Sequence, residues 1–134
     1  MTLRPTPTID DGNKAFWDAC EAGELRLQRC TPCGHLRYPI STVCPECLSA
    51  DADWEVLSGR GTVFSFCIFR HAYNEAWRDR LPYNVALIQL EEGPRMLSNV
   101  QGVLPEEIHV GLAVKVAFEV EQGFSIPIFE RAMS

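Results

Sequence analysis

Hydrophobic residues are spaced in two different patterns along the chain, and the second pattern begins near residue 53. Between residues 10 and 22 they recur at helical spacing, so we expect a helix capped by Asp10 or Asp11 and ended by Gly23. Beyond residue 53, short runs rich in β-branched and aromatic side chains are separated by glycine and proline, which is typical of strands. The expected strands cover residues 54–57, 62–69, 85–90, 96–100, 114–120 and 125–129.

The arrangement of these strands favours a small barrel. Within 114–120, apolar and polar residues alternate, as in a strand with one buried face. One helical turn is expected at 104–108, before that strand. Five or six strands with a short helix before the fifth fit a Greek-key barrel such as the OB-fold.

Four cysteines form two close pairs, Cys30 with Cys33 and Cys44 with Cys47, and ten residues separate the pairs. Two-residue gaps let each pair bind from one tight turn, and four thiolates are a soft tetrahedral set that suits Zn²⁺. Two disulfides, or unpaired buried thiols, remain alternatives. Because all four ligands would be sulfur, no position is left for water, which marks such a site as structural rather than catalytic.

The flanking sequence agrees with a metal module at residues 24–52. Gly34 can take a positive φ after the first pair, and Pro45 fixes φ inside the second. So short a segment cannot build a sufficient core, so an ion would replace one. Arg29 and Arg37 are placed to offset the negative charge that four thiolates leave on Zn²⁺. We therefore divide the chain into an arm and helix at 1–23, a zinc ribbon at 24–52 and a barrel at 53–134.

Composition and charge narrow the class of protein. Hydrophobic residues at 46% and charged residues at 22% are globular values. The formal net charge of −6 lacks the basic footprint of nucleic-acid binders, so we expect no nucleic-acid partner. No run approaches the roughly 20 apolar residues that span a bilayer, and the N-terminus has no apolar signal segment, so we expect no membrane association and a cytoplasmic location. Cys20 and Cys67 lie in apolar surroundings and are expected to be buried thiols.

Residues 70–83 break the strand pattern, with a segment too long for a hairpin turn and rich in aromatic and basic side chains. Three roles stay open for it: contact with a partner protein, packing over the barrel mouth, or contact with a ligand. In the last case the aromatic residues would stack on a ring and the arginines would meet phosphates. The residues concerned are Tyr73, Trp77, Tyr83, Arg70, Arg78 and Arg80.

Three segments hold more apolar area than a chain of this size is expected to leave in water. They are the predicted helix, the 70–83 segment and the C-terminal tail. We predict that a partner covers at least two of them. The predicted partner-contact residues are Phe16, Trp17, Tyr73, Trp77, Tyr83, Ile128 and Phe129.

Catalytic motifs are missing from the sequence. It contains no Gly-x-Ser-x-Gly elbow, phosphate-binding loop, dinucleotide fingerprint or His-Glu-x-x-His. The histidines lie apart and the carboxylate pairs flank turns, so no acid and base are paired. The sequence predicts no catalytic residue and no activity of the chain on its own.

Several short motifs together resemble one family. They are Phe16-Trp17, Gly23-x-Leu25-x-Leu27-Gln28-x-Cys30, Cys33-Gly34-x-x-Arg37-Tyr38-Pro39, Cys44-Pro45-x-Cys47, Gly59-x-Gly61-x-Val63, Leu81-Pro82-Tyr83 and Gly111-x-x-Val114-x-Val116. From about residue 13 to the C-terminus the chain resembles the acyl-CoA-associated zinc-ribbon and OB-fold proteins known as domain of unknown function 35. The resemblance implies a mainly β fold: an N-terminal helix, a rubredoxin-like zinc ribbon and a five- to six-stranded OB-fold barrel. The implied zinc ligands are Cys30, Cys33, Cys44 and Cys47.

The resemblance also implies a role. Such proteins are non-catalytic accessory subunits of thiolase-like enzymes, among them thiolases, acyltransferases and the aldolases that cleave steroid side-chain acyl-CoA thioesters. We therefore expect a thiolase-like partner subunit, with acyl-CoA at the shared interface. A direct acyl-CoA-binding module, with Arg70, Arg78 and Arg80 on the CoA phosphates, is the first alternative. A nucleic-acid-binding OB domain is the second, and the net charge disfavours it.

Overall fold

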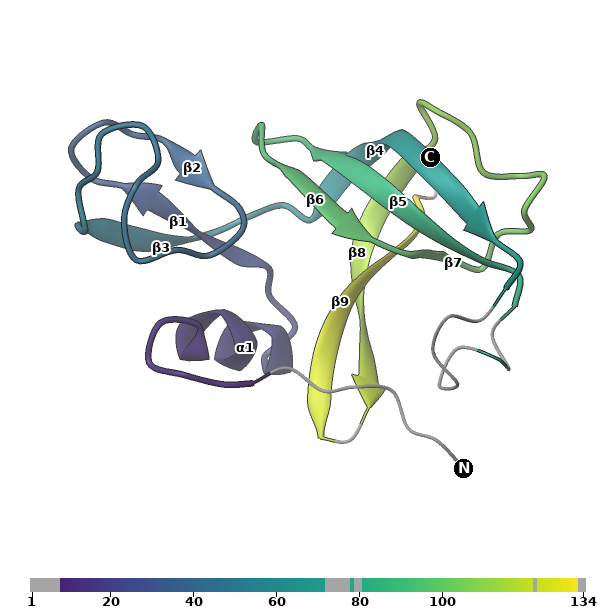
Figure 1. The fold of residues 1–134 in the computed structure, drawn as a ribbon, viewed down its shortest axis with the longest axis horizontal. Coiled ribbons are helices and arrows are strands. Elements are labelled where there is room, and N and C mark those ends of the chain that lie inside the picture. Colours follow the sequence, from purple (N-terminus) through teal and green to yellow (C-terminus); the bar gives the residue numbers. More distant parts are fainter. Residues whose placement is uncertain (1–7, 72–77, 79–80, 122, 133–134) are drawn as a thin grey trace.

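The computed structural model describes residues 8–71, 78, 81–121 and 123–132. Within them it has one helix and two β-sheets (Figure 1). The elements in chain order are α1 (Lys14–Glu21), β1 (Arg26–Cys30), β2 (Leu36–Arg37), β3 (Ala52–Val56), β4 (Arg60–Phe69), β5 (Tyr83–Leu90), β6 (Arg95–Ser98), β7 (Val100–Gln101), β8 (Ala113–Glu121) and β9 (Phe124–Arg131). Five of the six strands expected from the sequence are present with shifted ends, whereas the one expected over 96–100 is divided into β6 and β7.

The helix α1 begins later than its capping signal suggested. Asp10 Oδ1 accepts hydrogen bonds from the backbone N–H groups of Gly12 (2.8 Å) and Asn13 (2.9 Å), so this side chain organises a turn before the helix. The helix itself begins at Lys14. Gly23 follows its end with φ +80°, the left-handed conformation that favours glycine after a helix.

The smaller sheet has the strand order β2-β1-β3 and is antiparallel throughout. β3 pairs with all of β1, from Arg26 opposite Val56 to Cys30 opposite Ala52. The strand expected as the start of the barrel thus completes the sheet that holds the cysteine pairs. The chain crosses to the second sheet over residues 57–59 (Figure 1).

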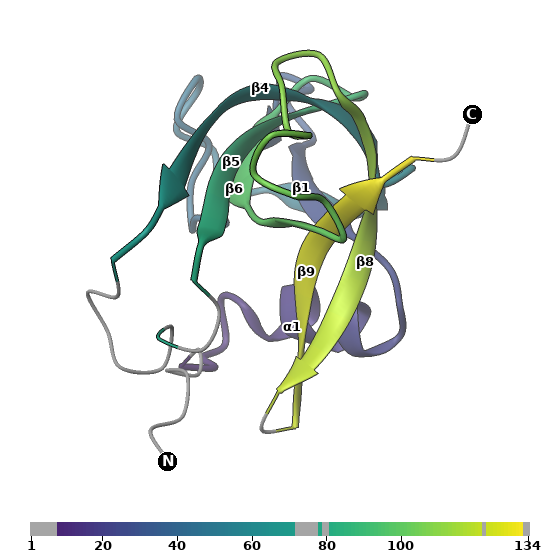
Figure 2. The same ribbon diagram turned by 90° about the vertical axis from the view of Figure 1, so that its right-hand side faces the viewer.

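The larger sheet has the order β6-β5-β4-β8-β9-β7. β7 runs parallel to β9, and the other pairs are antiparallel. The sheet curls strongly (Figure 2), but among the described residues no ladder joins its end strands β6 and β7. The expected OB-fold is confirmed, and in the described residues it is a curled sheet that does not close into a barrel. The helical turn expected at 104–108 is a hydrogen-bonded turn instead, in which Glu107 Oε1 accepts from the Leu104 N–H.

One hydrophobic core runs through both sheets. Leu27 of β1, Ile88 of β5 and Phe129 of β9 are each 0% exposed and belong to the same buried cluster. The helix α1 joins this core beside β9, where Trp17 meets Phe124 edge-on with ring centroids 6.3 Å apart (Figures 1 and 2). The shared core gives the two sheets a fixed relation.

The two cysteines outside the close pairs lie in different surroundings. Cys20 is buried as expected, and burial raises the pKa of its thiol to about 12. Cys67 is exposed, so the expectation of burial was wrong for this residue. The uniformly apolar run around it gives no sign of which face points outward. In the part of the chain that the structure describes, no helix has the length and apolar character to cross a membrane.

Candidate metal centre and surrounding surfaces

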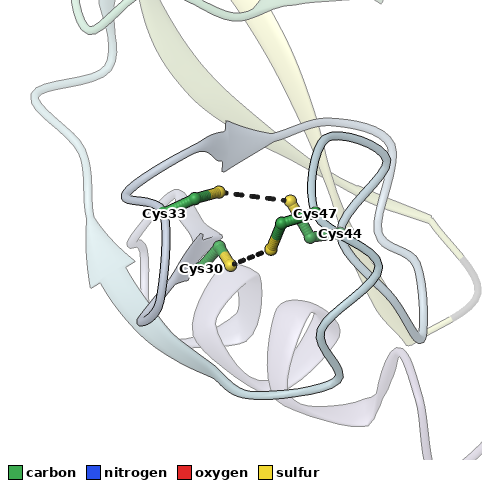
Figure 3. A group of neighbouring side chains, drawn as sticks. All are labelled: Cys30, Cys33, Cys44 and Cys47. Atoms are coloured by element: carbon green, nitrogen blue, oxygen red, sulfur yellow. Dashed lines mark hydrogen bonds between the residues drawn. The ribbon is translucent and has the colours of Figure 1, made fainter.

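The four cysteine sulfurs of the two close pairs meet at one point (Figure 3). Cys30 Sγ lies 3.4 Å from Cys47 Sγ, and Cys33 Sγ lies 3.6 Å from Cys44 Sγ. All four sulfurs lie within 4.8 Å of one another, and all four cysteines are free thiols. Sulfurs bound at about 2.3 Å to a tetrahedral Zn²⁺ lie about 3.8 Å apart. The donor set and its spacing therefore fit Zn²⁺ and not a pair of disulfides.

The two turns that carry the cysteines have the same backbone design. Gly34 N–H donates to Cys30 O at 2.8 Å, and Leu48 N–H donates to Cys44 O at the same distance. Gly34 and Leu48 also share a positive φ, of 78° and 64°. The sequence pointed to Gly34 for this role but gave no sign of Leu48, because a leucine rarely takes that conformation.

The Cys30 and Cys44 N–H groups are satisfied alike, through His35 O and Ser49 O, each at 2.8 Å. Backbone groups also tune the sulfurs. Burial of the Cys44 thiol works to raise its pKa, but hydrogen bonds from the backbone N–H groups of Cys47 and Glu46 and from the Cys33 and Cys30 thiols together lower the pKa to about 7. The Glu46 N–H lies 3.4 Å from Cys44 Sγ. A thiol that ionises near neutral pH is ready to bind a metal ion.

Two arginines connect the backbone segments around the four sulfurs through hydrogen bonds. Arg29 grips both carboxylate oxygens of Glu55, at 3.0 and 2.7 Å, and donates to Gly34 O at 2.7 Å. It thereby ties the first cysteine turn to β3. Arg37, only 2% exposed, donates to Gln28 Oε1 (3.1 Å) and Ser41 O (3.2 Å), and so fixes the loop that leads to the second cysteine turn.

The predicted partner contacts need correction in part. Phe16, Ile128 and Phe129 are 6%, 4% and 0% exposed, so these side chains build the chain's own core and do not face a partner. The apolar C-terminal tail, which suggested an exposed contact surface, is the middle of strand β9, and neighbouring strands cover its side chains. Trp17 and Tyr83 are half-buried, and their contact with a partner stays a prediction.

The 70–83 segment is described only in part. Tyr73, Trp77 and Arg80 lie outside the described residues. Arg70, directly after β4, and Arg78 are both exposed, and their predicted contact with CoA phosphates stays a prediction. Tyr83 stacks on Phe69 with ring centroids 5.1 Å apart and planes inclined by 10°.

Both halves of the chain match known domain families. Residues 17–53 match the family described as the rubredoxin-like zinc ribbon domain of ChsH2, and residues 54–119 match the family described as its C-terminal OB-fold domain. The fold and the four-sulfur site thus define a zinc-ribbon and OB-fold protein. Among solved structures, the Ltp2-ChsH2(DUF35) aldolase contains a chain that matches with a TM-score of 0.85 and 33% identity, over 96% of this chain and 100% of that one. The chain therefore belongs to the ChsH2-type DUF35 family.

Curated relatives have several kinds of name. A probable enoyl-CoA hydratase alpha subunit of Thermomonospora curvata is 35% identical over 98% of this chain and 41% of its own length. A DUF35 domain-containing scaffold protein of Methanothermobacter thermautotrophicus is 33% identical over 70% of this chain and 71% of that protein. The benzoylsuccinyl-CoA thiolase subunit BbsA of Thauera aromatica is 31% identical over 58% and 52%. The chain thus spans less than half of the hydratase subunit that it matches.

Proposed function

We propose that this chain is a non-catalytic accessory subunit that binds a thiolase-like acyl-CoA enzyme and holds it in an active assembly. The observation that carries the proposal is the match to the whole of the ChsH2 chain in the Ltp2-ChsH2 aldolase. That chain is one component of a two-component enzyme by its name. The scaffold protein and the thiolase subunit among the relatives support the same role.

The metal centre supports a structural role for this chain. Its four donors are all sulfur, so an ion bound there has a complete tetrahedral shell and no open position for water or substrate. In this role Zn²⁺ would hold Cys30, Cys33, Cys44 and Cys47 together and contribute folding free energy. The residues Arg29 and Arg37 keep the two cysteine turns in register with β3 and with each other.

The substrate class follows from the partner. Acyl-CoA thioesters, including those of steroid side chains, would react in the enzyme subunit, with the acyl-CoA entrance at or near the shared interface. This chain would act in the cytoplasm, without a nucleic-acid partner, and would supply shape and not a reacting group.

The proposal is tested by co-expression of the chain with a thiolase-like acyl-CoA enzyme subunit from the same organism. We expect a complex of defined stoichiometry that survives gel filtration, and enzyme turnover that needs both components. The proposal fails if the two proteins elute separately at micromolar concentration and the thiolase-like subunit is fully active without this chain.

Direct acyl-CoA binding is the second candidate, and one feature favours it. A hollow of about 420 Å³ lies between β5 and β7, with Tyr83, Asn84 and Glu119 among its lining residues. Tyr83 offers a ring for stacking, and Arg78 is exposed in the segment that precedes β5. Binding of CoA by the isolated chain, followed by calorimetry, would support this candidate, whereas the accessory role expects no such binding without the partner.

A further inference from the structure

The outward side of β4, β5 and β6 carries apolar side chains in place of the polar ones expected there. These three strands are neighbours and form one end of the larger sheet (Figures 1 and 2). Their inward residues, such as Ala86 and Ile88, are 0% exposed. The residues between them point the other way, because side chains alternate along a strand. We call this side the outer β4–β5–β6 face; its apolar members are Phe64, Cys67, Val85, Leu87 and Leu97.

The members of the face are neighbours across the strands. Leu87 lies opposite both Ser65 of β4 and Leu97 of β6, and Cys67 lies opposite Val85. Leu97 is 61% exposed and Cys67 is also exposed. The face is therefore continuous across three strands, and contiguous exposed apolar surface of this kind marks contact sites on soluble proteins.

A β-bulge adds Phe64 to this face. The register between β4 and β5 shifts between Val63 and Ser65, so Phe64 has no opposing residue in the ladder. Val63 is 1% exposed in the core, whereas Phe64 is 45% exposed. Bulges re-aim side chains in this way, here by placing a large ring outward.

Arg95 places a positive charge beside Phe64 on this face, and Arg60 places a second one at the start of β4, beside β8. The Arg95 guanidinium carbon lies 3.8 Å from the centre of the Phe64 ring, and its Nε donates to Gln89 Oε1 at 2.9 Å. Within the described part of the chain no carboxylate pairs with Arg95. The stacking and the hydrogen bond order the guanidinium, and arginine binds carboxylates through two parallel hydrogen bonds. Arg95 can therefore bind a carboxylate of a partner protein.

Next to Leu97 the face is hollowed. A depression of about 310 Å³ is lined by Tyr83, Val85, Leu97, Ser98 and Asn99. Such a depression can take one large apolar side chain, and anchors that fill pockets carry much of the affinity of an interface.

We propose that the outer β4–β5–β6 face is the surface on which the thiolase-like enzyme subunit docks, and that this subunit brings an apolar patch with a carboxylate for Arg95. The inference rests on the proposed function and names the surface that performs it. The proposed surface differs from the interface predicted from the sequence, which included the α1 and C-terminal segments, because Phe16, Ile128 and Phe129 in those segments are buried.

Charge argues against a second copy of the chain as the occupant. A two-fold symmetric contact needs a surface that complements itself. The outward residues of the three strands include Arg95 and Arg60 but no aspartate or glutamate. The glutamates at the nearby turn, Glu91 and Glu92, accept hydrogen bonds from Ser58 in the link between the sheets, at 2.8 and 2.7 Å. A copy would therefore leave Arg95 without its carboxylate.

Two substitutions on the face test the proposal, and the probe is the purified thiolase-like subunit that the co-expression experiment pairs with this chain. Leu97→Asp places a carboxylate in the centre of the contact, and Arg95→Glu reverses its charge. Val120→Asp is the matched control, because Val120 is 73% exposed on β8, where it lies opposite Ser125 and away from the face. Circular dichroism and zinc content are measured to check that each variant is folded.

We expect Leu97→Asp and Arg95→Glu each to weaken binding by about 30-fold or more, while Val120→Asp stays within about threefold of wild type. If both face variants bind like wild type, the docking surface is wrong although the accessory role stands. If wild type itself does not bind the subunit, both the surface and the proposed function are overturned. If the isolated chain is a dimer that Leu97→Asp dissociates, the occupant is a second copy and the proposal is wrong.

Discussion

The Asn84 side chain and the Val100 backbone bond to each other in both directions. Asn84 Nδ2 donates to Val100 O at 2.8 Å, and Val100 N–H donates to Asn84 Oδ1 at 2.7 Å. Asn84 lies on β5 and Val100 begins β7, two strands that are not neighbours in the sheet. Asn99 Nδ2 also donates to Asn84 O. A side-chain amide thus bridges the opening that the backbone ladder leaves in the curled sheet.

Asn84→Ala is expected to lower the free energy of unfolding by about 2 kcal/mol, because it removes the hydrogen-bond partner of the N–H and C=O groups of the buried Val100. Urea unfolding measures the change. Gln101→Ala is the control, since it removes only an exposed bond to Glu119 and costs a few tenths of a kcal/mol. An Asn84→Ala variant as stable as that control would show that the bridge contributes nothing.

Gly59 lies in the link between the two sheets and has two reasons to be glycine. Its φ is +80°, and a Cβ there would lie 2.4 Å from Cγ1 of Val116. Gly123 shares the positive φ, at +82°, but its Cβ would meet nothing within 4 Å. Both substitutions to alanine carry the backbone cost of about 1–2 kcal/mol. We expect Gly59→Ala to cost about 1–3 kcal/mol more, from overpacking against Val116. Equal melting temperatures of the two variants would contradict the clash.

Cys44→Ser is expected to abolish zinc binding and to unfold residues 30–52, because three sulfurs leave the tetrahedral shell incomplete. Zinc per chain is measured by elemental analysis, and local unfolding by amide hydrogen exchange. Cys67→Ser makes the same chemical change at an exposed cysteine outside the cluster and should keep one zinc per chain. Retention of a full equivalent of zinc by Cys44→Ser would rule out the four-sulfur site.

The pair of Arg29 and Glu55 predicts a pH dependence. The hydrogen-bonded Arg29 guanidinium lowers the pKa of Glu55 below its ordinary value of 4.5. A carboxyl whose pKa is lower in the folded state stabilises the fold above its unfolded pKa, and this contribution disappears as the pH falls through the folded pKa. The difference in unfolding midpoint between wild type and Glu55→Gln should therefore be largest above pH 4.5. It should shrink as the pH falls below 4.5 and disappear below the folded-state pKa of Glu55.

Glu24→Gln is the control for this pH series. Its pair with Arg26, at 2.7 Å, joins residues two apart in sequence and no two strands. Glu55→Gln should lose stability near neutral pH where Glu24→Gln changes little. A difference that stays constant from pH 7 to below the folded pKa would contradict the assigned role of Glu55.

The local chemistry of the ribbon could be predicted from the sequence because it depends on near neighbours. Two residues between the cysteines of each pair dictate a tight turn, and the turns bring the sulfurs together. The expected strands were also found, since each is a short apolar run between breakers. The Gly59 and Gly61 positions of the family motif have a physical reason as well: a Cβ on Gly61 would lie 2.5 Å from Gln89 O.

Which side of a strand is buried could not be predicted where the sequence is apolar on both sides. Residues 62–69 give no alternation, so neither the bulge that turns Phe64 outward nor the exposure of Cys67 was foreseen. The burial of Ile128 and Phe129 was not foreseen either, because it depends on β7, which is distant in sequence, and on the way the sheet curls around the core. Pairing over long distances also decided that β3 joins the ribbon sheet.

The central claim is that this chain acts through an enzyme subunit and not alone. The most direct measurement is acyl-CoA turnover by a fixed amount of the thiolase-like subunit while the chain is titrated into it. We predict no turnover by the chain alone, and turnover by the mixture that rises to a plateau at a fixed molar ratio. Turnover by the isolated chain that is lost when one of its own residues is changed, or partner turnover that is indifferent to the chain, would contradict the claim.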